Sequence, residues 1–201
     1  MTLDEGLSTG LFCDQRDNRA LVRDLSRGAR VLNLFSYTCS FTVAAGLGGA
    51  VETVSVDLSG RALERGEGNL ALNGLGGPAH RLLRADALSF LARQVRGKAQ
   101  FDCVILDPPS FGTRSRGTFS VERDYPSLLE QSLAVLRKGG RLLAVTNHRK
   151  TSPARFLAMI REAARARARE IATVRELPMP ADYPHRPGGE LPTKSALVTL
   201  V

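Results

Sequence analysis

The sequence predicts an α/β fold: a seven-stranded, mostly parallel sheet with a reversed last strand and helices on both faces. Short apolar runs alternate with amphipathic stretches from about residue 30 onward, which is typical of strands and helices in turn. The apolar runs are continuous rather than alternating, as in parallel strands that are buried on both faces. No helical stretch separates the last two runs, so we expect them to form an antiparallel hairpin at one edge.

The predicted elements follow one another without a long linker. Residues 1–29 are expected to form an N-terminal segment whose stretch 14–25 is a helix near the ligand cleft, and residues 30–201 the ligand-binding domain. The apolar runs predict strands at Val31–Phe35, Thr53–Val56, Arg81–Leu83, Cys103–Leu106, Arg141–Val145, Ile171–Val174 and Ala196–Leu200. Capped or amphipathic stretches predict helices at Ser40–Leu47, Ser59–Leu72, Ala87–Val95, Tyr125–Leu136 and Pro153–Ala168. Gly139-Gly140 is interpreted as the signal that ends the fourth of these helices.

The composition is that of an ordinary globular protein, with 43% hydrophobic and 24% charged residues in a chain of 201. Three widely spaced cysteines do not form a disulfide framework, so we expect the protein to reside in the reducing cytoplasm. No apolar run is long enough to span a bilayer, and the first residues lack the basic region of a signal peptide, so we expect no membrane association. The net charge of +8 suits a nucleic-acid partner, although an arginine-rich composition alone has the same effect.

In a doubly wound sheet, ligands bind at the carboxyl ends of the strands. The turn after the first predicted strand, residues 33–40, leads into a helix whose amino end suits an anionic group. It lacks the G-x-G-x-x-G pattern that a dinucleotide pyrophosphate requires, which argues against NAD and FAD. An ordinary tight turn without a ligand is the alternative.

Three aspartates end neighbouring predicted strands. Asp57 is placed to accept hydrogen bonds from ribose hydroxyls, because the helix-capping role is already filled by Ser59. Asp86 suits either an adenine amino group or the N-cap of the next helix. Asp107 opens the turn Asp-Pro-Pro-Ser-Phe, in which two prolines fix the backbone and Phe111 is suited to stack on a planar base.

Four stretches together resemble class I S-adenosylmethionine-dependent methyltransferases, specifically the catalytic domain of bacterial 23S ribosomal RNA methyltransferases. They are Thr9–Arg19 (TGLFCDQRDNR), Val31–Ala50 (VLNLFSYTCSFTVAAGLGGA), Val54–Asn73 and Phe101–Phe111 (FDCVILDPPSF). The resemblance implies a Rossmann-like fold, S-adenosyl-L-methionine as the cofactor, and 23S ribosomal RNA or a large-subunit assembly particle as the partner. It departs at Cys39, where the family usually has glycine and a side chain would crowd the cofactor.

The resemblance also implies which residues form the cofactor site. The turn after the first strand would cradle the methionine part, and the N-terminal helix would fold over the cleft. Asp57 would hold the ribose, and Asp107 would lie beside the methyl group. The full implied set is Gln15, Arg16, Asn33, Phe35, Ser36, Tyr37, Asp57, Leu58, Ser59, Asn73, Asp86, Ala87 and Asp107.

The chemistry of the acceptor atom narrows the expected reaction. Carbon-5 of cytosine needs prior attack by a cysteine thiolate, and residues 146–150, after the fifth strand, contain no cysteine. A ring or exocyclic nitrogen, such as guanine N7, carries its own lone pair and needs only alignment. We therefore predict direct in-line methyl transfer to a base nitrogen, with Asp107, Pro108, Phe111 and Asn147 as the catalytic positions.

Basic residues in loops on the expected cleft side would neutralise RNA phosphates. Together with the stacking aromatic, the predicted RNA site is Phe111, Arg114, Arg116, His148, Arg149, Lys150 and Arg186. His80 and His185 have no metal-ligand spacing with any cysteine, so we expect no metal. The alternatives are a cytosine-C5 methyltransferase, a protein or small-molecule methyltransferase, and an inactive RNA-binding module of the same fold.

Overall fold

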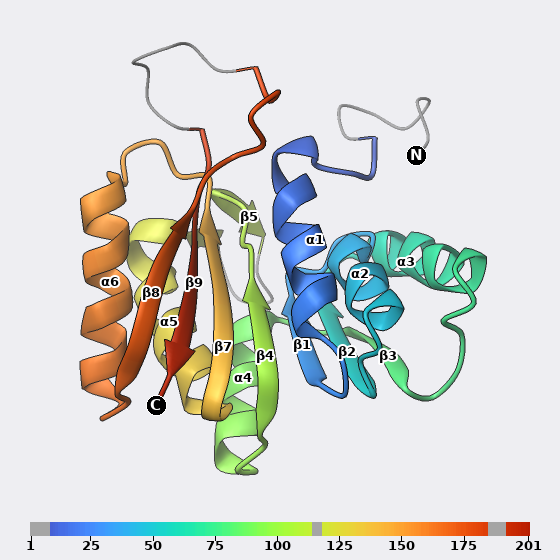
Figure 1. The fold of residues 1–201 in the computed structure, drawn as a ribbon, viewed down its shortest axis with the longest axis horizontal. Coiled ribbons are helices and arrows are strands. Elements are labelled where there is room, and N and C mark those ends of the chain that lie inside the picture. Colours follow the sequence, from blue (N-terminus) through green and yellow to red (C-terminus); the bar gives the residue numbers. More distant parts are fainter. Residues whose placement is uncertain (1–8, 114–117, 185–191) are drawn as a thin grey trace.

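The computed structural model describes residues 9–113, 118–184 and 192–201. In this described part, seven strands form one sheet in the order β3-β2-β1-β4-β7-β9-β8 (Figure 1). All neighbours are parallel except β9, which runs antiparallel to both β7 and β8. The strands are β1 Arg30–Leu34, β2 Glu52–Asp57, β3 His80–Arg84, β4 Phe101–Leu106, β7 Leu136–Thr146, β8 Ile171–Leu177 and β9 Lys194–Leu200. This arrangement confirms the predicted fold class, with the reversed last strand inserted one position inside the sheet edge.

Helices cover both faces of the sheet (Figure 1). They are η1 Cys13–Gln15, α1 Arg16–Leu25, α2 Ser40–Leu47, α3 Gly60–Leu72, α4 Ala87–Arg96, α5 Val121–Ala134 and α6 Pro153–Ala166. Successive strand residues point to opposite faces, so the core divides into two clusters. Leu32 and Leu34 of β1 pack with residues of α4, α5 and α6, whereas Val31 packs with residues of α1 and α2.

Two features of the fold differ from the sequence-based expectation. The fourth expected helix ends at Ala134 rather than Leu136, and β7 begins at Leu136, which pairs with Phe101 of β4. Gly139, with a φ of 68°, lies inside β7 and allows a backbone irregularity there instead of ending a helix. A short hairpin of β5 Phe111–Thr113 and β6 Thr118–Ser120, which was not expected, follows β4.

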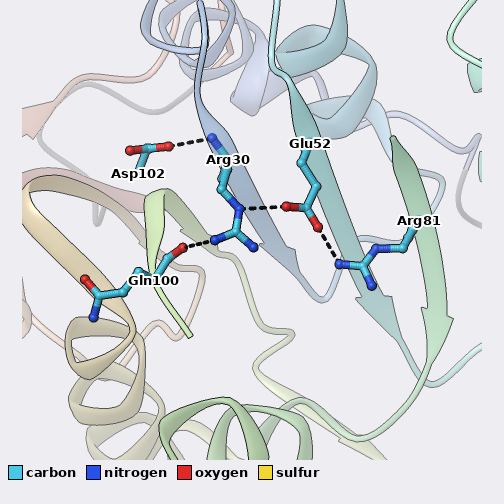
Figure 2. Close-up of polar contacts among 5 residues, drawn as sticks. All are labelled: Arg30, Glu52, Arg81, Gln100 and Asp102. Carbon is cyan, nitrogen blue, oxygen red and sulfur yellow. Dashed lines mark hydrogen bonds and ion pairs between the residues drawn. The ribbon is translucent and has the colours of Figure 1, made fainter. Parts of the chain in front are cut away.

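A polar network joins the amino ends of four parallel strands, β1, β2, β3 and β4 (Figure 2). Glu52 accepts hydrogen bonds from Arg30 and Arg81, and the Arg30 backbone amide donates to Asp102 at 2.6 Å. Arg30 also donates to the carbonyl of Gln100 at 2.8 Å. These contacts link β1, β2, β3 and β4 at their amino ends, opposite the carboxyl ends where ligands are expected. In the residues that the structure describes, no helix combines the length and apolarity needed to cross a membrane.

Candidate functional site

A cavity of about 380 Å³ opens at the carboxyl ends of the central strands. Its walls come from the N-terminal segment, from the turns after β1, β2, β3, β4 and β7, and from the approach to β9. The lining residues are Phe12, Asp14, Gln15, Arg19, Phe35, Ser36, Tyr37, Ser40, Phe41, Val56, Asp57, Leu58, Ser59, Ala85, Asp86, Ala87, Leu88, Asp107, Pro108, Pro109, Phe119, Asn147 and Thr193. Doubly wound sheets bind their ligands at these carboxyl ends of the strands.

The turn between β1 and α2 has an unusual backbone. Phe35, Tyr37 and Cys39 have φ values of 58°, 48° and 64°, all in the left-handed region that non-glycine residues rarely adopt. Ser36 anchors this turn to the neighbouring strand, because its backbone amide donates to the carbonyl of Val56 at 3.0 Å. Strained backbone of this kind clusters at ligand sites, where surrounding contacts hold it in place.

The carboxylate of Asp57 is held by two backbone amides. Tyr37 N–H donates to its Oδ2 at 2.8 Å, and Ser59 N–H donates to its Oδ1 at 2.9 Å. Each oxygen keeps acceptor capacity, and the residue lines the cavity. The carboxylate is therefore pre-oriented to accept hydrogen bonds from a pair of neighbouring hydroxyls, as on a ribose.

Two further aspartates line the cavity and have different environments. Asp86 accepts from Ser89 N–H at 2.9 Å, so it is the N-cap of α4 while also reaching the cavity. Asp107 has no hydrogen-bond partner among the described residues. Burial, together with the negative charge of Asp14, raises the pKa of Asp107 to about 7. Asp107 can therefore exchange a proton near neutral pH.

The N-terminal segment lies across the cavity and is tied down on both sides. On one side, the carbonyl of Gly10 accepts from Thr38 Oγ1 at 2.6 Å. On the other, Asp14 Oδ2 accepts from Thr193 Oγ1 at 2.7 Å, and Asn18 Nδ2 donates to Ser195 Oγ at 3.0 Å. We call residues 9–15 the strap. It brings Phe12, Asp14 and Gln15 into the cavity wall.

Three residues of the predicted cofactor set lie away from the cavity. Arg16 is exposed, and its guanidinium pairs with Asp182 at 2.7 Å. Asn33 is buried and donates to Thr42 Oγ1 at 2.9 Å, because its position on β1 faces the α2 layer. Asn73 follows α3 and lines a second, more open hollow of about 430 Å³ between α1, α2 and α3. All the other predicted cofactor residues line the cavity.

The residues predicted to contact substrate are placed less uniformly. Pro108 and Asn147 line the cavity, and Ser110 Oγ–H donates to Asn147 Oδ1 at 2.6 Å. His148 was expected at the RNA surface but is buried, with Nδ1 2.9 Å from Thr151 Oγ1 and its carbonyl accepting from Lys194 Nζ at 2.9 Å. It therefore braces the segment after β7 instead of facing solvent.

Among the remaining predicted RNA contacts, the structure describes the side chains of two. The side chains of Arg149 and Lys150 are exposed. Phe111 begins β5, but its side chain lies outside the described part of the structure, as do Arg114, Arg116 and Arg186.

Sequence reasoning missed several lining residues. Phe119 packs against Phe35 with ring centroids 5.7 Å apart, and Phe12 packs against Tyr37 at 5.7 Å. Arg19 and Thr193 come from α1 and from the approach to β9. The stretch Thr9–Arg19, which carried the family resemblance, was a signal for Phe12, Asp14 and Arg19. Nothing local in the sequence marks Thr193.

All three cysteines lie in the described part of the chain, and none of them lines the cavity. Cys39 is buried, and a Cβ built on Gly66 of α3 would come within 2.6 Å of its Sγ. The thiol therefore packs against α3 and does not crowd the cavity. Cys103 is buried inside β4, where burial raises the pKa of its thiol to about 12.

The lining has the chemistry of a nucleoside site with a charged tail. Apolar side chains such as Val56 and Leu88 offer a surface for a flat base, and Asp57 and Asp86 offer acceptors for hydroxyl and amino groups. The donor set therefore fits S-adenosylmethionine. The described residues include no cluster of three or more His, Cys, Asp or Glu side chains that could hold a metal ion.

Comparison with known proteins agrees with this geometry. The chain is 44% identical over 152 residues to the Ribosomal RNA large subunit methyltransferase K/L of Allochromatium vinosum. The matched stretch covers 75% of this chain and 20% of that protein. The crystal structure of SMU.776 complexed with SAH has a TM-score of 0.86 and 32% identity, over 97% of this chain and 51% of that one. The SAM-dependent methyltransferase of Agrobacterium tumefaciens has a TM-score of 0.77 and 25% identity, over 95% and 63%.

This chain thus spans about one fifth of the curated relative and about half of SMU.776. The model of one protein family, described as S-adenosylmethionine-dependent methyltransferase, matches residues 1–192, which is nearly the whole sequence. The chain therefore belongs to the family of S-adenosylmethionine-dependent methyltransferases.

Proposed function

We propose that this chain transfers a methyl group from S-adenosylmethionine to a base of 23S ribosomal RNA, at a ring or exocyclic nitrogen such as guanine N7. The observation that carries the proposal is the single cavity that joins the amide-held carboxylate of Asp57 to Asp107 and Asn147. The 44% identity to a ribosomal RNA large subunit methyltransferase supports the choice of substrate. The same proposal places the protein in the cytoplasm, with the RNA or a large-subunit assembly particle as its partner.

The cofactor site follows from the lining residues. Asp57 would hold the ribose hydroxyls, and Asp86 and Ala87 would lie along the adenine. The left-handed turn at Phe35–Tyr37 would cradle the methionine part. When bound, the cofactor supplies a methyl group attached to a positively charged sulfur. The nitrogen lone pair forms the new bond to the methyl carbon, and the electron pair of the broken S–C bond stays on sulfur.

The substrate side of the cavity has one oriented donor and one proton-exchanging acid. Ser110 donates to Asn147 Oδ1, which leaves the Asn147 amide N–H groups to face an acceptor atom of the base. Asp107 in its ionised form would accept the proton released from an exocyclic amine. At a ring nitrogen no proton is lost, and Asp107 would instead balance the positive charge that the base acquires.

Direct transfer needs no covalent nucleophile, and the cysteine positions support it. A cytosine-C5 mechanism requires a thiolate at the base, whereas none of the three cysteines lines the cavity. Cys13 is exposed, Cys39 packs on α3, and Cys103 is buried in β4 with a raised pKa. The placement of Cys39 also removes the reason for expecting an inactive module, because its side chain points away from the cavity.

The test is transfer of labelled methyl groups to 23S ribosomal RNA and to assembly particles of the large subunit, followed by digestion and mass spectrometry of the nucleosides. We expect a product methylated on a base nitrogen, with 16S ribosomal RNA unlabelled in the same reaction. An Asp57→Ala variant should lose cofactor binding in calorimetry, because the ribose loses its acceptors. Label confined to protein or to a small molecule, or found on carbon-5 of cytosine, would overturn the proposal.

A further inference from the structure

Acidic side chains outnumber basic ones in the described lining of the cavity. Four carboxylates line it, from Asp14, Asp57, Asp86 and Asp107. Among the described lining residues, Arg19 of α1 is the one cation. A ligand of this family carries an amino-acid tail with one carboxylate, one ammonium group and, before transfer, a sulfonium. The positive groups of such a ligand have four carboxylates as possible partners, whereas its carboxylate has one cationic side chain among the described lining residues.

Arg19 is available for this pairing. Its Nη1 donates to the carbonyl of Phe12 at 2.7 Å, and no carboxylate among the described residues forms an ion pair with it. The guanidinium has five N–H donors, so most of them remain for a ligand. Burial lowers the pKa of Arg19, while the negative charge of Asp14 acts in the opposite direction. A half-buried guanidinium without an acidic partner gains more from a bound carboxylate than an exposed one does.

The position of Arg19 agrees with the part of the ligand concerned. Arg19 and Ser40, the first residue of α2, both line the main cavity and also the second hollow, so they lie in the wall between the two. Phe35, Ser36 and Tyr37 of the preceding turn line the main cavity as well. The guanidinium therefore lies at the end of the cavity where the methionine part is expected.

We propose that Arg19, and not Arg16, binds the α-carboxylate of the cofactor's methionine part. This inference rests on the proposed function, because it assumes that the cavity binds S-adenosylmethionine. Arg16 lies one turn earlier on the same helix, but its guanidinium is exposed and paired with Asp182. Arg19 also holds the strap through the carbonyl of Phe12, so its effect on ligand binding must be separated from an effect on the strap.

A pair of ligands makes that separation. S-adenosylmethionine and its decarboxylated form differ only in the carboxylate, and calorimetry measures the affinity of each without any transfer reaction. We expect Arg19→Met to weaken S-adenosylmethionine binding about ten- to hundredfold, as for the loss of a charged hydrogen-bonded pair. Its effect on the decarboxylated form should stay within about threefold. Arg19→Lys should recover part of the preference, because it keeps the charge but not the planar pair of donors.

Two matched variants complete the experiment. Arg16→Met and Arg23→Met remove arginines one turn before and one turn after Arg19, and neither residue lines the main cavity. Both should keep the wild-type preference for the carboxylated ligand. Equal weakening of both ligands in Arg19→Met would show that Arg19 only supports the strap, and loss of the preference in Arg16→Met would assign the carboxylate to Arg16. Either result would overturn the inference, as would an unchanged Arg19→Met. A wild-type protein that binds neither S-adenosylmethionine nor S-adenosylhomocysteine would instead contradict the proposed function.

Discussion

At the residue scale, the ionisation of Asp107 should make the affinity for the cofactor depend on pH. Burial raises its pKa to about 7 from a usual value of 3.8, so the carboxyl is mostly neutral below pH 7 and mostly ionised above it. S-adenosylmethionine carries a positive sulfonium, whereas S-adenosylhomocysteine has a neutral sulfur. We therefore expect the affinity for the first, relative to the second, to rise by up to about tenfold between pH 6 and pH 8. Calorimetry with both ligands across this range measures the ratio.

The isosteric variant Asp107→Asn is the control for this pH dependence. It cannot ionise, so its affinity ratio should stay flat across the same range. The variant should also be more thermostable than wild type at pH 8, because ionising a buried carboxyl costs the native state free energy above its raised pKa. At pH 4 that difference should nearly vanish. A wild-type ratio that is independent of pH would contradict the role given to Asp107.

The contact between Cys39 and Gly66 is also testable at the residue scale, because the Cys39 thiol leaves no room for a side chain at position 66. A Cβ on Gly66 would come within 2.6 Å of Cys39 Sγ, and the next non-cysteine atom, in Thr38, is 3.5 Å away. Gly66→Ala should therefore destabilise the protein by about 1–3 kcal/mol through overpacking. In a Cys39→Gly background the clash is gone, and the same change should stabilise by up to about 1 kcal/mol through helix propensity. Urea unfolding of the four proteins measures this reversal of sign.

The same helix offers a matched control for that cycle. Gly68 lies two residues further along α3 with no other atom within 4 Å of a built Cβ. Gly68→Ala should stabilise in both backgrounds, since nothing is there to clash. Cys39→Gly by itself should change the affinity for S-adenosylhomocysteine by less than about twofold, because the thiol faces α3 and not the cavity. A large loss of affinity would mean that the cysteine shapes the ligand site after all.

At the element scale, the strap should behave as a closure that can be loosened without unfolding the protein. Thr193 donates to Asp14 across the cavity at 2.7 Å and is itself buried. Thr193→Val keeps the shape and removes the hydrogen bond, so we expect the cofactor to dissociate several times faster while the melting temperature shifts little. Stopped-flow release of S-adenosylhomocysteine measures this rate. Arg16→Gln, which breaks the exposed pair with Asp182, should leave the rate unchanged.

The elements themselves could be predicted from the sequence to a large extent. Continuous apolar runs located the seven strands, and the missing helix before the last one predicted its reversal. The start of β7 was misjudged because Gly139-Gly140 is typical of a helix end, whereas pairing of Leu136 with Phe101 draws the chain into the sheet first. Tertiary pairing of this kind has no local signal.

The site was predictable where a strand end determined it and less so where distant segments met. Asp57 and Asp107 follow directly from strands, so their place in the cavity followed from the fold class. Asn33 lies between Leu32 and Leu34, and the alternation of a strand turns it to the α2 face. Thr193 reaches Asp14 across 179 positions of sequence, and a contact of that range leaves no trace in a single sequence.

At the scale of the whole molecule, the net charge of +8 matters only through where the cations lie. Arg149 and Lys150 are exposed directly after Asn147, whose side chain lines the cavity. Arg161 and Arg165 are also exposed, but they lie on α6, which contributes no residue to the cavity lining and packs at the β8 side of the sheet (Figure 1). If the proposed RNA substrate is held at the cavity mouth, the first pair contacts phosphates and the second does not.

These two pairs make the position of the charge testable. Binding of a 23S ribosomal RNA transcript should weaken with salt, because each phosphate contact contributes about 0.7–0.9 to the slope of log affinity against log salt. Arg149→Ala with Lys150→Ala should reduce that slope by about 1.4–1.8 and weaken binding at low salt. Arg161→Ala with Arg165→Ala removes the same net charge and should leave the slope nearly unchanged. Equal effects of the two pairs would mean that the RNA responds to net charge alone, in which case the surface beside Asn147 does not position the substrate.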